Sequence, residues 1–69
     1  MKTEYRGHVI DIATKEESGL LWAAVAWIWP AHSEPGLNDA VEVSGYKSET
    51  EAVEAAQLLS EKRIDTHDR

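Results

Sequence analysis

The chain has 69 residues, enough for one small domain spanning 1–69, and at this length a fold buries only about 60% of its unfolded surface. Thirteen acidic residues against seven basic ones give a formal net charge of −6, which repels nucleic-acid phosphates and anionic lipids, so we do not expect a nucleic acid as partner. There is no cysteine, and the three histidines lack ligand spacing, so we expect no disulfide, no metal and no cofactor.

The N-terminal residues lack the apolar core of a signal peptide, and no apolar run approaches the roughly 20 residues that a membrane span needs. We therefore expect no membrane association and a cytoplasmic location. A chain this short usually needs a supplement to its core, and without disulfides or metals the natural supplement is oligomerisation.

Residues 5–13 are the first predicted strand, with Ile10 and Ile12 pointing to the core and Gly7 marking a bulge or a close backbone approach. Residues 14–19 are charged and end in Ser-Gly. They predict a hairpin loop, which makes the first two strands antiparallel neighbours.

Residues 20–30 carry all three tryptophans and are apolar on both faces. Turn formers bound the stretch, and its aromatic and β-branched residues favour a strand, although the central Ala-Ala-Val-Ala is also compatible with a helix. A strand that is apolar on both sides is usually central in its sheet and covered twice. One face would carry Leu20, Trp22, Ala24, Ala26 and Ile28, and the other Leu21, Ala23, Val25, Trp27 and Trp29.

Residues 30–39 form the longest irregular stretch, with a tight turn expected at 34–36 and Leu37 packing back under the loop. Residues 40–46 predict a third strand. Val41 and Val43 share one face of it and Glu42 and Ser44 the other, a pattern typical of a strand near a sheet edge.

A helix follows, opened by a capping box in which Ser48 is the N-cap and Glu51 reaches back to it. We expect the helix to end near Arg63, with Ile64 folding back as an anchor. Residues 1–4 and 65–69 are expected to fray. The side of the helix predicted to face the sheet is an alanine-rich stripe of Ala52, Ala55, Ala56 and Leu59.

This order predicts an α+β fold, a three-stranded antiparallel β-meander with one C-terminal helix packed on one face (β-β-β-α). The sequence leaves open which face of the tryptophan strand the helix covers. Ala24 and Ala26 are small enough to receive the alanine stripe. On that arrangement the uncovered residues, and the candidate interface, are Leu21, Val25, Trp27 and Trp29.

Three motifs run through the chain: Tyr5-x-Gly7, Trp22-x-Ala24, and Gly45-Tyr46-x-Ser48-Glu49-x-Glu51-Ala52, the last leading to a helix that closes at Ile64-Asp65. The pattern resembles short bacterial proteins of unknown function with a three-stranded sheet and one C-terminal helix. The topology is also similar to the double-stranded-RNA-binding fold without its first helix, and to antitoxin domains of the HicB type without their last strand. The resemblance implies a fold and no established activity.

No catalytic constellation is visible, since the serines lack flanking elbow glycines and His8 and Asp11 fall on opposite strand faces. We therefore expect a non-enzymatic module for protein–protein interaction or homodimerisation through the tryptophan-bearing face. An alternative from topology is a nucleic-acid-associated or antitoxin-like domain, which needs the basic residues to converge. A third is an enzyme or ligand-binding protein that uses the 30–39 loop, which would need a deep cavity lined by Trp22, His32 and a carboxylate.

Overall fold

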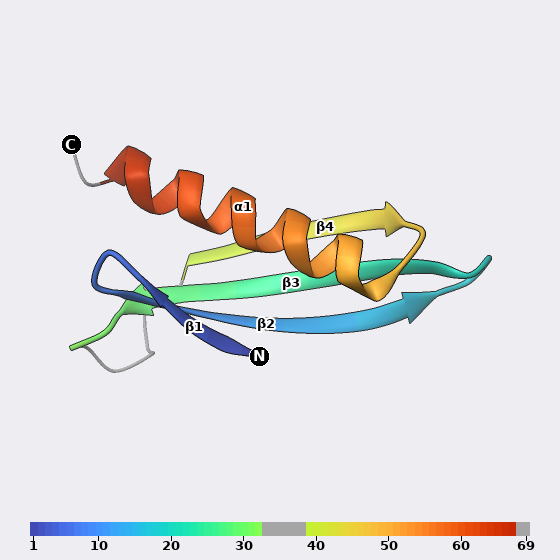
Figure 1. Ribbon diagram of the computed structural model, residues 1–69, viewed down its shortest axis with the longest axis horizontal. Helices are drawn as coiled ribbons and strands as arrows, with labels where there is room; N and C mark the ends of the chain where they lie inside the picture. Colours follow the sequence, from blue (N-terminus) through green and yellow to red (C-terminus); the bar gives the residue numbers. More distant parts are fainter. Residues whose placement is uncertain (33–38, 68–69) are drawn as a thin grey trace.

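The computed structural model describes residues 1–32 and 39–67, which form a twisted antiparallel sheet with one helix across it (Figure 1). The strands are β1 (Lys2–Tyr5), β2 (His8–Glu17), β3 (Leu21–Pro30) and β4 (Asp39–Tyr46), and the helix is α1 (Glu49–His67). The strands are hydrogen-bonded in chain order, β1-β2-β3-β4. The α+β class and the C-terminal helix are confirmed, but the sheet has four strands where we predicted three.

The additional strand comes from a turn that we interpreted as the interior of one strand. Residues 5–13 are divided by Arg6 and Gly7, whose φ angles are 48° and 80°. Positive φ at both positions is the geometry of a two-residue type I′ hairpin turn, for which an Arg-Gly pair is a weak sequence signal. Residues 2–4, which we expected to fray, are therefore part of the edge strand β1, with Thr3 opposite Ile10.

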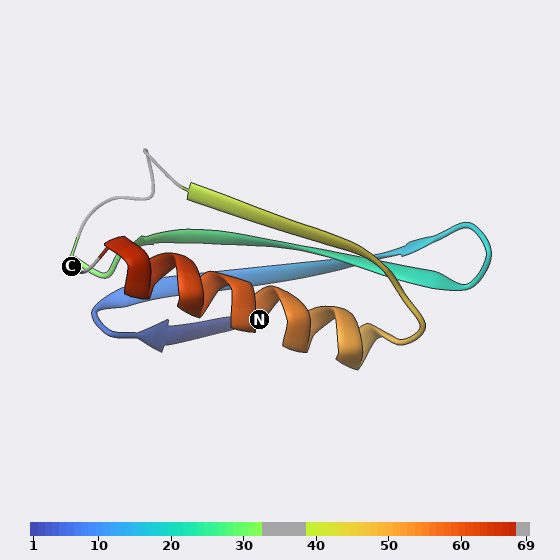
Figure 2. The ribbon, with the colours of Figure 1, turned by 90° about the horizontal axis from the view of Figure 1, so that it is seen from above.

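The long β2–β3 hairpin is the centre of the molecule, and its tip projects beyond the start of α1 in both views (Figures 1 and 2). Its ladder runs from the His8–Pro30 pair to the Glu17–Leu21 pair. The connecting loop is therefore shorter than the predicted 14–19 segment, and it holds Gly19 and Leu20 at φ 80° and 63°. The expected turn at 34–36 and the packing of Leu37 lie outside the described residues.

The core lies between α1 and one face of the sheet. Ile10 and Ile12 point into it as predicted, and so does Val41 of β4. Opposite them, α1 presents a stripe spaced every four residues. The fully or almost fully buried residues of that stripe are Ala52, Ala56, Ser60 and Ile64.

Two predictions about α1 were wrong. Leu59 was assigned to the buried stripe, yet 42% of it is exposed and Ser60 occupies the buried position. The Ser60 hydroxyl donates to the Ala56 carbonyl at 2.7 Å, so the backbone satisfies its polarity inside the core. The helix also does not end near Arg63 but continues to His67, and Ile64 is buried as part of the helix. Residues 65–67 are thus helical instead of frayed.

The capping box at the start of α1 is confirmed. The Glu51 amide donates to Ser48 Oγ at 3.1 Å, and the Ser48 hydroxyl donates to a Glu51 carboxylate oxygen at 3.3 Å. Just before it, β4 contains a bulge: Val43 pairs with Ala24 but Tyr46 pairs with Trp22, which leaves one extra residue on β4. Gly45, at φ 82°, supplies the left-handed conformation that this bulge requires. The bulge returns Tyr46 to the side of the sheet that packs against the core.

Candidate functional site

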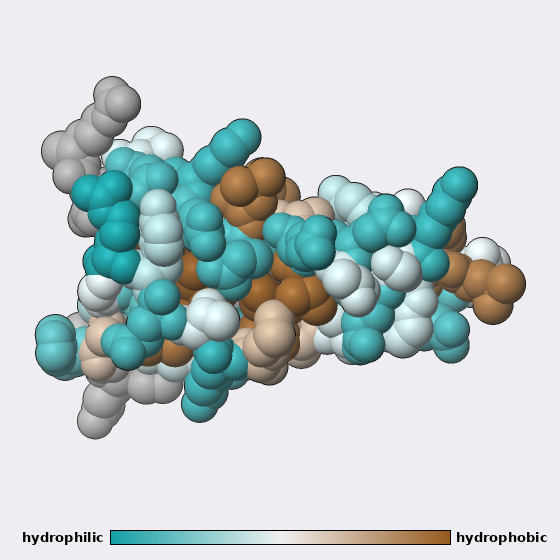
Figure 3. All heavy atoms as spheres, viewed as in Figure 1, coloured by the Kyte–Doolittle hydropathy of each residue, from teal (hydrophilic) through white to brown (hydrophobic). Residues whose placement is uncertain are grey.

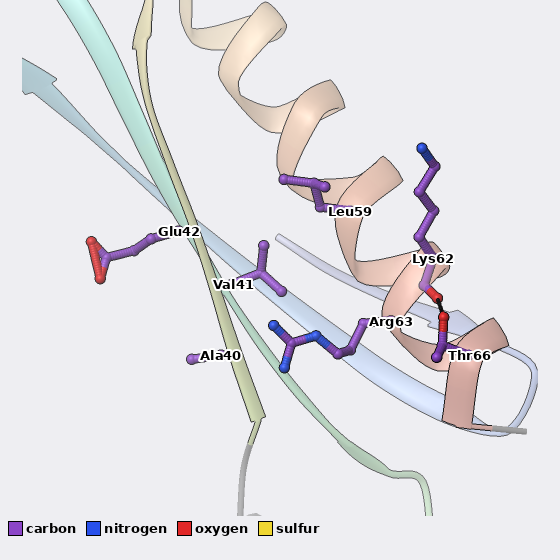
Figure 4. Close-up of a pocket in the computed structure, with 7 residues that line it drawn as sticks. All are labelled: Ala40, Val41, Glu42, Leu59, Lys62, Arg63 and Thr66. Atoms are coloured by element: carbon purple, nitrogen blue, oxygen red, sulfur yellow. Dashed lines mark hydrogen bonds between the residues drawn. The ribbon is translucent and has the colours of Figure 1, made fainter.

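The helix covers the face of β3 that carries Ala24, Ala26 and Ile28, each no more than 4% exposed. This answers the question that the sequence left open. The opposite side of the sheet, here called the open face, is covered by no described element. Figure 4 shows the alternation on β4, with Ala40 and Glu42 pointing away from α1 and Val41 pointing toward it. Strand register places these residues of β2, β3 and β4 on the open face: Val9, Asp11, Ala13, Lys15, Glu17, Leu21, Ala23, Val25, Trp27, Trp29, Ala40 and Glu42.

All four residues of the candidate interface, Leu21, Val25, Trp27 and Trp29, lie on the open face. Trp27 is 37% exposed and Leu21 36% exposed, while Val25 and Trp29 are half-buried by their neighbours in the sheet. The third tryptophan, Trp22, lies on the other side of β3 and packs against the core, as its position beside Ala24 predicted. The structure thus divides the tryptophans into one core residue and two surface residues.

The open face is ordered in rows across the strands. Trp27 is paired with Asp11 on β2 and with Ala40 on β4. The next row along the sheet joins Ala13, Val25 and Glu42. Beyond it, Ala23 lies opposite Lys15. Both open-face tryptophans therefore lie toward the Pro30 end of β3, while the alanines are spread over the Trp27, Val25 and Ala23 rows.

The alanines create a hollow beside Trp27, open to solvent and about 520 Å³ in volume. Ala13, Ala23 and Ala40 contribute short side chains to its lining, so nothing fills the space above the backbone there. Lys15 and Glu42 also line the hollow, so an apolar floor is flanked by one positive and one negative side chain. Such a surface suits a large apolar side chain from a partner.

A second surface lies on the helix side, where Figure 3 shows hydrophobic residues near the middle of α1 and at the far end of the β2–β3 hairpin among mostly hydrophilic ones. Besides Leu21, the exposed leucines of the described residues are Leu20, Leu58 and Leu59. Leu59, Val41 and Lys62 line a groove between β4 and α1 (Figure 4). This groove could not be predicted from the alanine-rich stripe, because that pattern places Leu59 in the core.

A polar cluster fastens β1 to the C-terminal part of α1. The Tyr5 hydroxyl lies 3.1 Å from both carboxylate oxygens of Asp65, and Arg6 donates to Asp65 at 2.8 Å. Desolvation raises the pKa of the Tyr5 phenol above its ordinary value of 10.0, and the hydrogen bond to Asp65 and the charge of Glu61 raise it further. Because its pKa is raised, the Tyr5 phenol stays protonated at neutral pH and can donate to Asp65. This hydrogen bond connects β1 to the C-terminal part of α1.

Neither a metal site nor a basic cluster emerges in the part of the chain that the structure describes. No group of three or more histidine and carboxylate side chains there is placed to hold a metal ion. Arg6 and Arg63 form ion pairs with Asp65 and Asp39, each at 2.8 Å. Lys62 and Arg63 both line the groove between β4 and α1, whereas Lys15 lies on the open face. The described basic residues are thus divided between separate surfaces. No helix among the described residues is long and apolar enough to cross a membrane.

Comparison with known proteins adds no relative: the chain matches no family model, no curated protein and no solved structure. The resemblances drawn from the sequence motifs therefore remain predictions.

Proposed function

We propose that this protein is a small non-enzymatic interaction module that associates with a second copy of itself through the open face of its sheet. The observation that carries the proposal is the exposure of Trp27 and Leu21 on a sheet face that the single helix leaves uncovered. Tryptophan is enriched at the energetic centres of protein interfaces, and contiguous exposed apolar surface on a small domain marks an interaction site. The absence of cysteine fits a reducing compartment, and we include a cytoplasmic location in the same proposal.

The dimensions of the face support a dimer of modest affinity. Ten-residue strands at about 3.4 Å per residue, spaced about 4.8 Å apart, give the sheet a face of roughly 34 by 14 Å, or about 500 Å². A stable interface buries about 800 Å² per partner, and weak or transient interfaces bury less. We therefore expect dissociation at micromolar concentrations, where the interface contributes about 7 kcal/mol.

Sedimentation equilibrium over about 1 to 200 µM tests the proposal, a range that spans micromolar dissociation constants. The wild-type chain should pass from monomer to dimer within this range. The double variant Trp27→Ala/Trp29→Ala should remain monomeric, because it loses the two large side chains of the open face. Circular dichroism of each variant shows whether the fold is kept.

The matched control is Leu58→Ala/Leu59→Ala, which removes exposed apolar side chains from α1 instead of the sheet. We expect this variant to dimerise as the wild type does. Because the tryptophan variant loses packing within the sheet, Ala23→Glu serves as a second test: it adds a charged side chain to the open face and removes nothing. A wild-type monomer throughout the range, or a dimer that survives both open-face changes, contradicts the proposal.

A further inference from the structure

Side-chain size changes along β3 on the open face. Trp27 and Trp29 stand toward the Pro30 end, Val25 is in the middle, and Ala23 and Leu21 lie toward the hairpin tip. Trp27 borders a hollow that reaches from its own row, across the Val25 row, to the Ala23 row. A second copy turned end to end about the Val25 row therefore brings its Trp27 to the Ala23 end of this hollow.

Two sheets in face-to-face contact lie about 10 Å apart with their strands nearly aligned. If the two β3 strands ran in the same direction, Trp27 would meet its own counterpart and the two hollows would face each other as an empty space. If they run in opposite directions about a two-fold axis at Val25, Trp27 of each copy lies over Ala23 of the other. Trp29 then lies over Leu21 of the other copy. Close packing favours the second arrangement, since an unfilled hollow forfeits its contacts.

The charges on β2 favour the same arrangement. Asp11 lies in the row of Trp27 and Lys15 in the row of Ala23, one on either side of the Val25 row. Opposed β2 strands therefore bring Lys15 of each copy toward Asp11 of the other, which makes two equivalent ion pairs. Asp11 is accessible for this, because its nearest ion-pair partner in the structure, the N-terminal amine of Met1, is 3.8 Å away and its side chain is 33% exposed.

One contact in this arrangement is unfavourable. Glu42 lies in the Val25 row on β4, so the two Glu42 side chains face each other across the two-fold axis. Like charges that lie opposite each other are destabilising, although Glu42 is exposed and close to the sheet edge, where its carboxylate can turn toward water.

We propose that two copies stack their open faces with opposed β3 strands centred on Val25, each inserting Trp27 into the hollow over Ala23 of the other, with Lys15 paired to Asp11 across the interface. The inference rests on the proposed function and specifies the partner surface and its orientation. A two-fold contact of this kind closes on itself, because the same patch serves both copies.

Charge reversal on β2 tests the orientation. Lys15→Asp alone and Asp11→Lys alone each replace two attractive pairs by two repulsive ones, and each should raise the dimer dissociation constant about tenfold. The double variant Lys15→Asp/Asp11→Lys restores opposite charges and should bring the constant back to within about twofold of the wild type. Sedimentation equilibrium measures all four proteins under one salt condition.

The controls separate the pair from net charge. Lys47→Asp and Glu54→Lys make the same changes in net charge outside the open face and should leave the dissociation constant nearly unchanged. Glu42→Gln should tighten the dimer severalfold by removing the opposed carboxylates. If the wild type dimerises and the double reversal does not recover, the orientation is wrong while the proposed function stands. If the wild type stays monomeric, the proposed function and this inference fail together.

Discussion

At the scale of single residues, the fold raises the pKa of the Tyr5 phenol. Its pKa lies above 10.0 because of desolvation, the bond to Asp65 and the charge of Glu61. The folded state therefore holds this proton more tightly than the unfolded chain does, so the contribution to stability is complete below pH 10 and is lost as pH rises through the raised pKa. Absorbance titration should show one phenol above pH 10, and Asp65→Asn should lower its pKa. The titration step belongs to Tyr5 if it disappears in Tyr5→Phe. If the pKa of Tyr5 is unchanged in Asp65→Asn, then Asp65 does not contribute to the raised pKa.

Single residues also show where sequence reasoning works. Ser48 and Glu51 were predicted as a capping box because the signal depends only on residues three apart, and the hydrogen bonds are present. The turn at Arg6 was not predicted, because its φ of 48° is uncommon for a residue with a side chain. The turn there depends on β1 finding a partner in β2, a non-local requirement that a short window of sequence does not contain.

At the scale of elements, the small residues of α1 determine how close it lies to the sheet. Ala52 and Ala56 are fully buried against strands whose own core residues include Ala24 and Ala26. Ala56→Leu should cost about 1–3 kcal/mol in the free energy of unfolding, because the extra atoms force the helix away from the sheet. Ser60→Ala should change it by no more than about 0.5 kcal/mol, since the lost hydroxyl bonds only to its own helix.

Urea denaturation at one fixed protein concentration measures both changes. The control is Glu54→Leu, which places the same leucine side chain on the exposed side of α1 and should shift stability by about 0.5 kcal/mol or less. An Ala56→Leu variant as stable as the wild type would show that the layers have room between them. The buried residues of α1 from Ala52 to Ile64 are spaced every four residues, and one of them, Ser60, is polar. Because a core position is expected to be apolar, the neighbouring Leu59 was assigned to the stripe instead.

At the scale of the whole molecule, the proposed dimer predicts that stability depends on protein concentration. A 69-residue chain has a thin stability margin, and anything that binds only the folded form raises its apparent stability. The thermal midpoint of the wild type should therefore rise by several degrees between about 5 and 200 µM. Scanning calorimetry or circular dichroism measures it. Trp27→Ala/Trp29→Ala should melt at one temperature across the range, and a concentration-independent wild type argues against the dimer.

The sequence predicted the layers of the molecule better than the number of its strands. The doubly apolar stretch correctly indicated a strand inside the sheet, and among the described residues the helix covers one of its two faces, because alternation in a strand is a local property. The helix covers the face of β3 on which Ala24 and Ala26 are small enough to pack against the alanines of α1. The sequence suggested this arrangement, but only the packed structure decides between the two faces. The hollow beside Trp27 could not be predicted, since its lining comes from three strands whose register was unknown.

The bulge at Gly45 has a consequence for solubility. The two edge strands of a sheet have unpaired amides and carbonyls, which can pair with strands of other chains and so lead to aggregation. Here one border is β1, only four residues long, and the other is β4, which the bulge bends before it reaches Tyr46. Neither edge strand is long and straight, so edge-to-edge pairing with other chains is disfavoured. The open face of the sheet remains accessible. Deletion of Gly45, which removes the extra residue of the bulge, should straighten β4 and lead to fibrils, detectable with thioflavin T, under conditions where the wild type forms none.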